Sequence, residues 1–187
     1  MVGKRGAAVV LSSLLMMGSS WAWAATGQAD SGKPSGEPSG EARESVLCVG
    51  ASKSDYDPPL TLAPQQSRIR TTAHYACGVE PGGTVPAVGH MEGVAPEASC
   101  LGVNSSRLTE TVRYGDGKHS VIVYTRNTTV RVAGAITIRL SGEVTEGRGK
   151  GQAARRTVSG LPEQLPTECL SSGLTGSTGW AQLEIHP

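Results

Sequence analysis

Residues 135–144 read AITIRLSGEV, and apolar and polar side chains alternate along them. A period of two puts one set on each face of a β-strand. The apolar face would hold Ile136, Ile138, Leu140 and Val144, and the polar face Thr137, Arg139, Ser141 and Glu143. The same pattern runs through residues 107–146, with a hairpin signal at Gly115-Asp-Gly117. This stretch predicts the central meander of an antiparallel sheet, with one face on a core and the other in water.

Further strand patterns flank the meander. Arg68–Cys77 alternates well, and residues 46–49, 152–159 and 180–185 give shorter runs, whereas Pro64 limits residues 60–63 to an edge strand. No run shows a helical period. Seven or eight short strands separated by turn signals predict an all-β domain. We expect a single antiparallel β-sandwich of immunoglobulin-like type, with a small closed β-barrel as the alternative.

The chain divides into three parts. Residues 1–24 have a charged start at Lys4 and Arg5, a short apolar run and an Ala-Trp-Ala cleavage site, which predicts a signal peptide and a secreted protein. Residues 25–45 consist of Gly, Ser, Pro, Glu and Ala and predict a disordered linker. Residues 46–187 have the length of one domain. No later segment reaches the roughly 20 apolar residues of a membrane-spanning helix, so we expect no membrane insertion.

The four cysteines, Cys48, Cys77, Cys100 and Cys169, form an even set in a chain predicted to be exported, which favours two structural disulfides. Their wide spacing is unlike the C-x-x-C pairs of zinc sites. Three pairings are possible. We expect Cys77 with Cys100, closing a long loop, and Cys48 with Cys169, tying the first strand to the region before the last.

Charge gives no indication of a polyanionic partner. The chain has 17 Lys and Arg against 16 Asp and Glu, so removing Lys4 and Arg5 with the signal peptide leaves 15 against 16, a formal charge of −1. A nearly neutral protein has no global field that gathers nucleic acid. The one local basic cluster, Arg148, Lys150, Arg155 and Arg156, has acidic neighbours and is expected to form a solvated face.

Catalytic signatures are missing from the sequence. His74, His119 and Asp116 are scattered, and no nucleophile motif accompanies them. Asp55 and Asp57 could offer oxygens to calcium, but a turn capped by Asp before two prolines is the preferred interpretation. Gly147–Gly151 lacks the pattern of a phosphate loop. We therefore predict no catalytic, cofactor-binding or metal-binding residue, and no enzyme.

Two loops are candidates for a contact surface. Gly78–Ser99 is rich in Gly and Pro and carries His90 and Met91, and Ser171–Gly179 precedes Trp180. We expect a non-catalytic, secreted binding or surface-associated module that contacts a protein or cell-surface partner through one of these loops. The alternative is a secreted inhibitor of an extracellular hydrolase that inserts Gly78–Ser99 into the cleft of its target.

The order of several motifs resembles a group of small exported all-β proteins of filamentous Gram-positive bacteria. The motifs follow Cys48 in this order: Tyr56-Asp-Pro-Pro-Leu-Thr61, the Tyr-x-Cys ending at Cys77, Ser99-Cys100, Tyr114-Gly-Asp-Gly-x-x-Ser120, Ser141-Gly-Glu-Val-Thr-Glu-Gly147, Cys169 and Gly173-Leu-Thr175. Tyr114 stands where a Trp is common in the group, and Arg148 replaces the usual aromatic residue. The resemblance implies an exported β-sandwich and carries over no catalytic residue.

Overall fold

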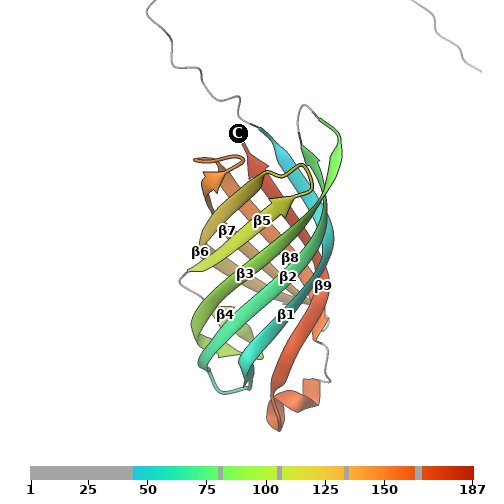
Figure 1. The fold of residues 1–187 in the computed structure, drawn as a ribbon. Coiled ribbons are helices and arrows are strands. Elements are labelled where there is room, and N and C mark those ends of the chain that lie inside the picture. The colour runs from blue at the N-terminus through green and yellow to red at the C-terminus, as the bar shows by residue number, and fades with distance from the viewer. Residues whose placement is uncertain (1–43, 80–81, 105–106, 133–134, 163–165) are drawn as a thin grey trace, which may run out of the picture. The chain divides into compact units, whose positions relative to one another are not determined.

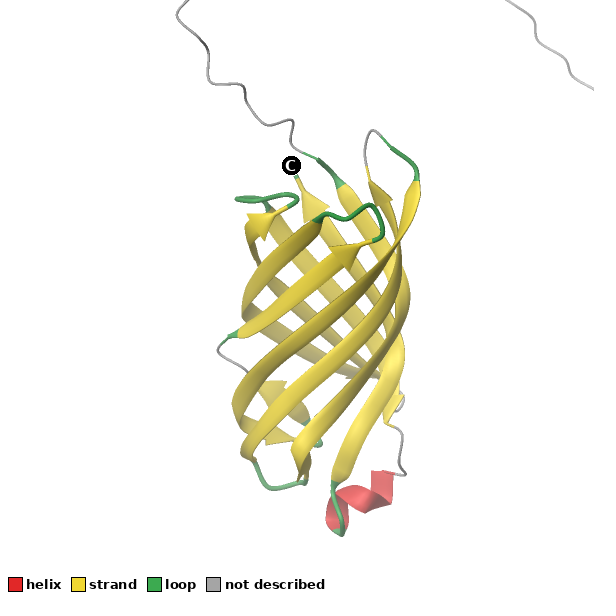
Figure 2. Ribbon diagram, in the orientation of Figure 1, coloured by secondary structure: helices red, strands yellow, loops and turns green. Residues whose placement is uncertain are grey.

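A computed structural model describes residues 44–79, 82–104, 107–132, 135–162 and 166–187. Within them, nine strands and one short 3-10 helix are found (Figures 1 and 2). The strands are β1 (Val46–Leu60), β2 (Gln65–Val79), β3 (Thr84–Ser99), β4 (Gly102–Asn104), β5 (Leu108–Tyr114), β6 (His119–Val132), β7 (Ala135–Gly147), β8 (Ala153–Pro162) and β9 (Leu174–His186), and the helix is η1 (Pro166–Leu170).

The fold is a closed antiparallel barrel, so the predicted sandwich is wrong. Strands β1, β2 and β3 pair in sequence, β3 pairs with β5, β5 to β9 pair in sequence, and β9 returns to β1. β4 alone lies outside, beside β3. Eight strands therefore form one continuous ring. Most are 13 to 16 residues long. Long coiled strands close on themselves and leave no free edge, whereas we expected short strands in two sheets.

Closure depends on bends within the strands. The β6–β7 register shifts between Val121 and Ile122 and again between Tyr124 and Arg126, and β1 shifts against β9 after Asp55. Such bulges increase strand twist and curvature. The hairpin predicted at Gly115–Gly117 is present, and Gly117 has a φ of 84° there, a conformation that favours glycine.

The predicted loop Gly78–Ser99 is mostly strand β3, which pairs with β2 and β5. Its small residues face neighbouring side chains inside the barrel. A Cβ atom at Gly89 would lie 2.5 Å from Glu110 Oε1 and 2.9 Å from Tyr75 Cε2. The Pro86 carbonyl accepts a hydrogen bond from Gly115 N at 2.7 Å, and Gly115 lies just beyond the end of β5. The missing N–H of Pro86 faces the same side, where β5 has ended, so the proline is tolerated. The Gly- and Pro-rich composition of this segment therefore led to the wrong prediction of a loop.

The two disulfides join Cys48 to Cys77 and Cys100 to Cys169, which corrects both predicted pairings. Cys48 and Cys77 are directly opposite each other on β1 and β2, with a Cα–Cα distance of 3.9 Å. The expected Cys77–Cys100 bridge does not form because β3 runs the length of the barrel between these two residues. Cys100 instead meets η1, before β9. Both bridges are consistent with an oxidising, extracellular environment.

Two predictions for the start of the chain lie outside the described residues: the signal peptide at 1–24 and all but the end of the linker at 25–45. In the part that the structure describes, no helix has the length and apolarity needed to cross a membrane. The barrel itself occupies Val46 to His186.

The interior is packed unevenly along the barrel axis. We call the end that holds Val46 and His186 the upper end, and the end that holds Leu60 and Leu174 the lower end, as in Figure 1. A large apolar cluster fills the upper half; its biggest members include Tyr75, Tyr114, Tyr124, Ile122, Leu183 and Ile185. A smaller cluster, containing Leu60, Ile69, Ala95, Ala98, Cys100 and Leu174, lies at the lower end. Open space remains beside this second cluster.

The fit of β3 against the interior can be tested at Gly89. Gly89→Ala should lower the free energy of unfolding by about 1–3 kcal/mol, because the added methyl group overlaps the Glu110 carboxylate and the Tyr75 ring. Chemical denaturation measures this change. Gly102→Ala is the matched control, since a Cβ at that position has no neighbour within 4 Å. Equal stability of the two variants would contradict the packing described.

Candidate functional site

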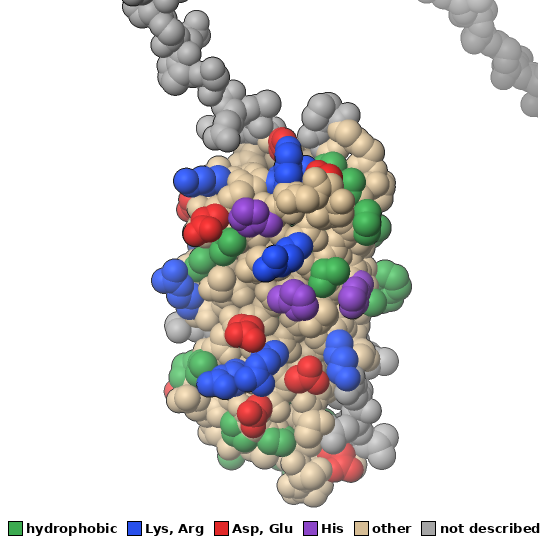
Figure 3. Space-filling model, in the orientation of Figure 1, with side chains coloured by type: hydrophobic (Ala, Val, Ile, Leu, Met, Phe, Trp, Pro, Cys, Tyr) green, Lys and Arg blue, Asp and Glu red, His purple; other side chains and the backbone are tan. Residues whose placement is uncertain are grey.

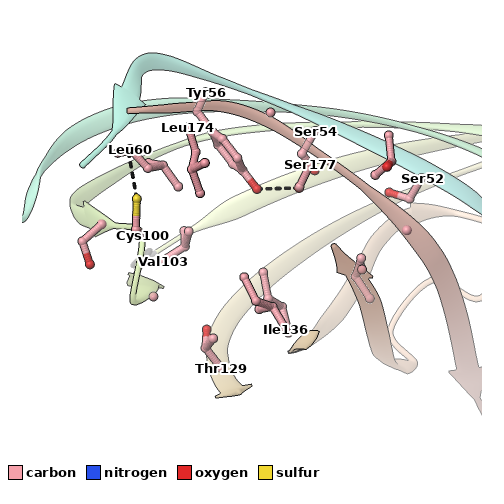
Figure 4. Close-up of a pocket in the computed structure, with 18 residues that line it drawn as sticks. Ser52, Ser54, Tyr56, Leu60, Cys100, Val103, Thr129, Ile136, Leu174 and Ser177 are labelled. Atoms are coloured by element: carbon pink, nitrogen blue, oxygen red, sulfur yellow. Dashed lines mark hydrogen bonds between the residues drawn. The ribbon is translucent and has the colours of Figure 1, made fainter. Parts of the chain in front are cut away.

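A cavity occupies the lower half of the barrel lumen (Figure 4). It has a volume of about 50 Å³ and opens to solvent at its mouth. The walls come from β1, β6, β7, β8 and β9, and the lip comes from the end of β3 and from β4. The cavity is therefore built on the rigid barrel, as small-molecule sites in barrels commonly are.

The cavity wall combines aliphatic side chains with neutral hydroxyl groups. The aliphatic residues are Leu60, Val103, Ile136, Ile138, Val158 and Leu174. The hydroxyl residues are Ser52, Ser54, Tyr56, Ser99, Thr129, Ser177 and Thr178. None of the described lining residues carries a charge. Such a wall suits an uncharged, mainly apolar molecule with a few polar atoms.

Several of these hydroxyl groups already have partners. Tyr56 OH and Ser177 Oγ are 2.8 Å apart and lie on the adjacent strands β1 and β9 (Figure 4). Ser54 Oγ and Thr71 Oγ1 are 2.9 Å apart on β1 and β2. By contrast, Thr129 Oγ1 is buried and has no hydrogen-bond partner in the described part of the chain. A buried hydroxyl without a partner is costly, and a bound molecule could satisfy it.

A polar cluster of Ser52, Tyr75, Glu110, Tyr124 and Arg156 meets the cavity at Ser52; we call it the lumen network. Arg156 Nη1 donates to Glu110 Oε1 at 2.5 Å, and both side chains are 0% exposed. Tyr75 donates to Oε1 at 3.1 Å, and Tyr124 to Oε2 at 2.7 Å. Arg156 Nη2 donates to Ser52 Oγ at 3.0 Å. Ser52 is the member that reaches the cavity wall.

Electrostatics keep the lumen network in one protonation state. Burial alone would lower the pKa of Arg156, but the charge and hydrogen bond of Glu110, together with Tyr75 and Tyr124, raise that pKa. Burial, reinforced by the negative charge of Glu110, raises the pKa of both Tyr75 and Tyr124. The phenols therefore remain neutral donors, and the guanidinium remains charged. The network carries one positive and one negative charge, which cancel.

At the mouth of the cavity, the Cys100–Cys169 disulfide joins the turn after β3 to η1. Cys100 is buried, whereas Leu101 beside it is exposed. Because η1 leads through a short turn into β9, the bridge holds together two segments that are 69 residues apart in sequence. The disulfide therefore braces the lip of the cavity.

The upper end is closed by Arg148, which extends from the glycine-rich turn between β7 and β8. Its side chain is 3% exposed and lies over the Tyr114 ring, 4.6 Å from the ring centroid. Arg148 Nε donates to Glu44 at 2.8 Å, and Nη2 donates to Asp116 at 2.5 Å. Lys118 also donates to Glu44, at 3.3 Å. Arg148 therefore covers Tyr114 at the upper end, and a second, more open pocket lies around it.

The predicted basic cluster is not one surface, so its assignment to a solvated face is wrong for two of its members. Arg155 and Lys150 are exposed, as expected. Arg156 faces the lumen because it follows Arg155 on a strand, and Arg148 turns inward onto Tyr114. On the face shown in Figure 3, charged side chains of both signs are interspersed.

The other residues singled out in the sequence do not converge. His74 lies exposed on β2 and His119 begins β6, and among the described side chains neither is hydrogen-bonded to Asp116. Asp55 and Asp57 lie exposed on β1 and not in a turn. Within the described ranges, no three His, Cys, Asp or Glu side chains form a group that could hold a metal ion.

The two predicted contact loops also change character. Residues 84–99 are β3, and 174–179 belong to β9, which leaves only short turns at 82–83 and 171–173 within the described chain. Trp180 is 69% exposed on the outer face of β9, where it pairs in register with Ala51. These segments therefore contribute walls to the barrel and do not protrude as loops.

Sequence reasoning missed Glu110, yet a signal was present. Glu110 stands between Leu108 and Val112 on the apolar face of its strand, and Arg156 stands between Ala154 and Val158 on another. An acid and a base at inward positions of two strands indicate a buried ion pair, since each would be costly alone. Only the three-dimensional closure shows that they meet.

Comparison with known proteins does not assign the chain to a family. No family model, no curated protein and no solved structure matches the chain.

The lumen network should be required for stability. Glu110→Ala leaves the charge of Arg156 buried without compensation and should cost about 3–5 kcal/mol in the free energy of unfolding. The control is Glu92→Ala, which removes an exposed ion pair with Arg70 and should change stability by no more than about 0.5 kcal/mol. Urea denaturation of both variants measures the difference. A loss from Glu110→Ala as small as the control would mean that the pair does not stabilise the barrel.

The upper end should respond to acid. Hydrogen bonds from the Arg148 side chain and the Lys118 backbone lower the pKa of Asp116. Burial raises the pKa of Glu44, but the hydrogen bonds and charges of Lys118 and Arg148 together lower it. Depressed carboxyl pKa values stabilise the fold above the ordinary values of 3.8 and 4.5, and this contribution is lost as the pH falls through the lowered values.

Arg148→Met should therefore be less stable than the parent protein near neutral pH and should lose less stability on acidification. Unfolding midpoints from neutral pH down to about pH 2 test this expectation. Parallel pH profiles for the two proteins would exclude Arg148 as the cause of the acid sensitivity.

Proposed function

We propose that the protein is an exported, non-catalytic binding protein whose lumen cavity holds a small, uncharged, mainly apolar molecule. The observation that carries the proposal is the cavity in the lower half of a barrel whose upper half is tightly packed. The described lining offers apolar contact and hydroxyl groups, which bind and orient a ligand. Export is supported by the signal-peptide pattern of residues 1–24 and by the two disulfides.

The inhibitor hypothesis relied on residues 78–99 as a braced loop that enters a cleft. Because most of these residues form β3, a wall of the barrel, no observation on the described chain favours an inhibitor over a binding module. Contact with a protein or cell-surface partner remains compatible with ligand binding, since the lumen and the outer wall are separate surfaces.

Filling the cavity should abolish binding. Val158 lines the lumen, so Val158→Trp places an indole in the space that a ligand would occupy. Ethylbenzene is a suitable small apolar probe, and amide chemical shifts on titration report its affinity. We expect saturable binding to the parent protein and affinity lower by at least about tenfold in Val158→Trp, because the excluded probe loses its apolar contacts.

Val130→Trp is the matched control, since Val130 is 52% exposed on β6 and does not line the cavity. This variant should bind ethylbenzene like the parent protein. Absence of saturable binding to the parent protein, or equal affinity in the two Trp variants, would overturn the proposal.

A further inference from the structure

The lumen network defines which polar group the ligand carries. We infer that the ligand presents an uncharged acceptor oxygen, such as that of a ketone or ester, to the Ser52 hydroxyl, and that Ser52 selects such ligands over carboxylates. The inference rests on the proposed function and specifies its ligand class. It depends on the hydrogen-bonding capacity that the network leaves unused at the cavity wall.

Ser52 is fixed as a donor toward the cavity. Its Oγ accepts a hydrogen bond from Arg156 Nη2 at 3.0 Å, and this is the only hydrogen bond of the Ser52 side chain within the described residues. A hydroxyl group that has accepted still has one proton to donate. Ser52 is 6% exposed and lines the cavity, so the space in which that proton finds an acceptor is the cavity itself.

The charge behind Ser52 strengthens this donor. A guanidinium that donates to a hydroxyl oxygen polarises the O–H bond, and hydrogen bonds in such chains reinforce one another. The Arg156 side chain is held in place by Glu110, which is in turn held by Tyr75 and Tyr124. The Ser52 donor is therefore oriented before any ligand arrives.

The same network disfavours an anionic ligand. A carboxylate that entered the lumen would lose its hydration and would need a positive charge in return. Arg156 is the charged group nearest to Ser52, but Glu110 already neutralises it, and both lie fully buried behind the wall. A neutral carbonyl loses less hydration and gains the Ser52 hydrogen bond. The aliphatic wall of Ile136, Ile138 and Val158 then covers the rest of the molecule.

Three probes of similar size test the inference: ethylbenzene, acetophenone and benzoate. Acetophenone should bind the parent protein about fivefold more tightly than ethylbenzene, because it gains one net hydrogen bond. Benzoate should bind more weakly than either. In Ser52→Ala the advantage of acetophenone should disappear while ethylbenzene affinity is retained. Ser52→Thr, which keeps a hydroxyl group, should restore the ratio of the two affinities.

Ser54→Ala is the matched control. Ser54 is also a cavity hydroxyl on β1, but it pairs with Thr71 and not with Arg156, so its removal should leave the acetophenone preference in place. Retained ethylbenzene binding shows in each variant that the lumen is intact.

The outcomes separate the two proposals. If neither ethylbenzene nor acetophenone binds the parent protein, the proposed function fails. If ethylbenzene binds but acetophenone binds no more tightly, or if Ser52→Ala and Ser54→Ala alter the preference equally, the Ser52 inference fails and lumen binding stands. Tighter binding of benzoate than of acetophenone would likewise overturn the preference for a neutral ligand.

Discussion

The buried ion pair between Glu110 and Arg156 constrains the rest of the molecule. Burying either charge alone inside a barrel would carry a prohibitive desolvation cost, so the two side chains must be paired and hydrogen-bonded at the same time. Arg156 reaches from β8 to Glu110 on β5, and its other donor binds Ser52 on β1. Tyr75 of β2 and Tyr124 of β6 donate the remaining hydrogen bonds to the Glu110 carboxylate. Five strands are thus held in register by one network, and a slip of any of them would leave a buried charge unsatisfied.

The ion pair also explains why the two halves of the lumen differ. Above it, tyrosine rings and aliphatic side chains pack closely up to Tyr114, and Arg148 covers that end. Below it, the inward positions carry serine, threonine and branched aliphatic residues around open space. Glu110 accepts hydrogen bonds from Arg156, Tyr75 and Tyr124, so this polar layer is fixed in place beside the cavity. The cavity therefore has a defined polar end and an apolar body.

Local patterns in the sequence predicted most of the strands but not the architecture. The alternation of residues 135–144 and 68–77 correctly placed Leu140, Val144, Ile69 and Tyr75 in the interior, and the turn at Gly115–Gly117 was recognised. The strand at 84–99 was missed because its inward positions are small, and they are small because Tyr75 and Glu110 fill the space opposite Gly89. Ring closure and the disulfide partners depend on contacts between β1 and β9 and between Cys100 and η1, which are distant in sequence. The same holds for the cavity, since its walls come from strands across the whole domain.

The open space has a compositional origin. An eight-stranded barrel encloses just enough volume for side chains to fill, provided that large ones are available. This chain has no Phe, and Trp180, the one Trp beyond the predicted signal peptide, is exposed on the outer face. The interior thus depends on four Tyr, of which Tyr75, Tyr114 and Tyr124 belong to the upper cluster and only Tyr56 lies at the lower end. Three aromatic rings fill one half of the lumen, and one ring cannot fill the other. In a closed barrel, this shortage of large side chains is the reason that a cavity exists.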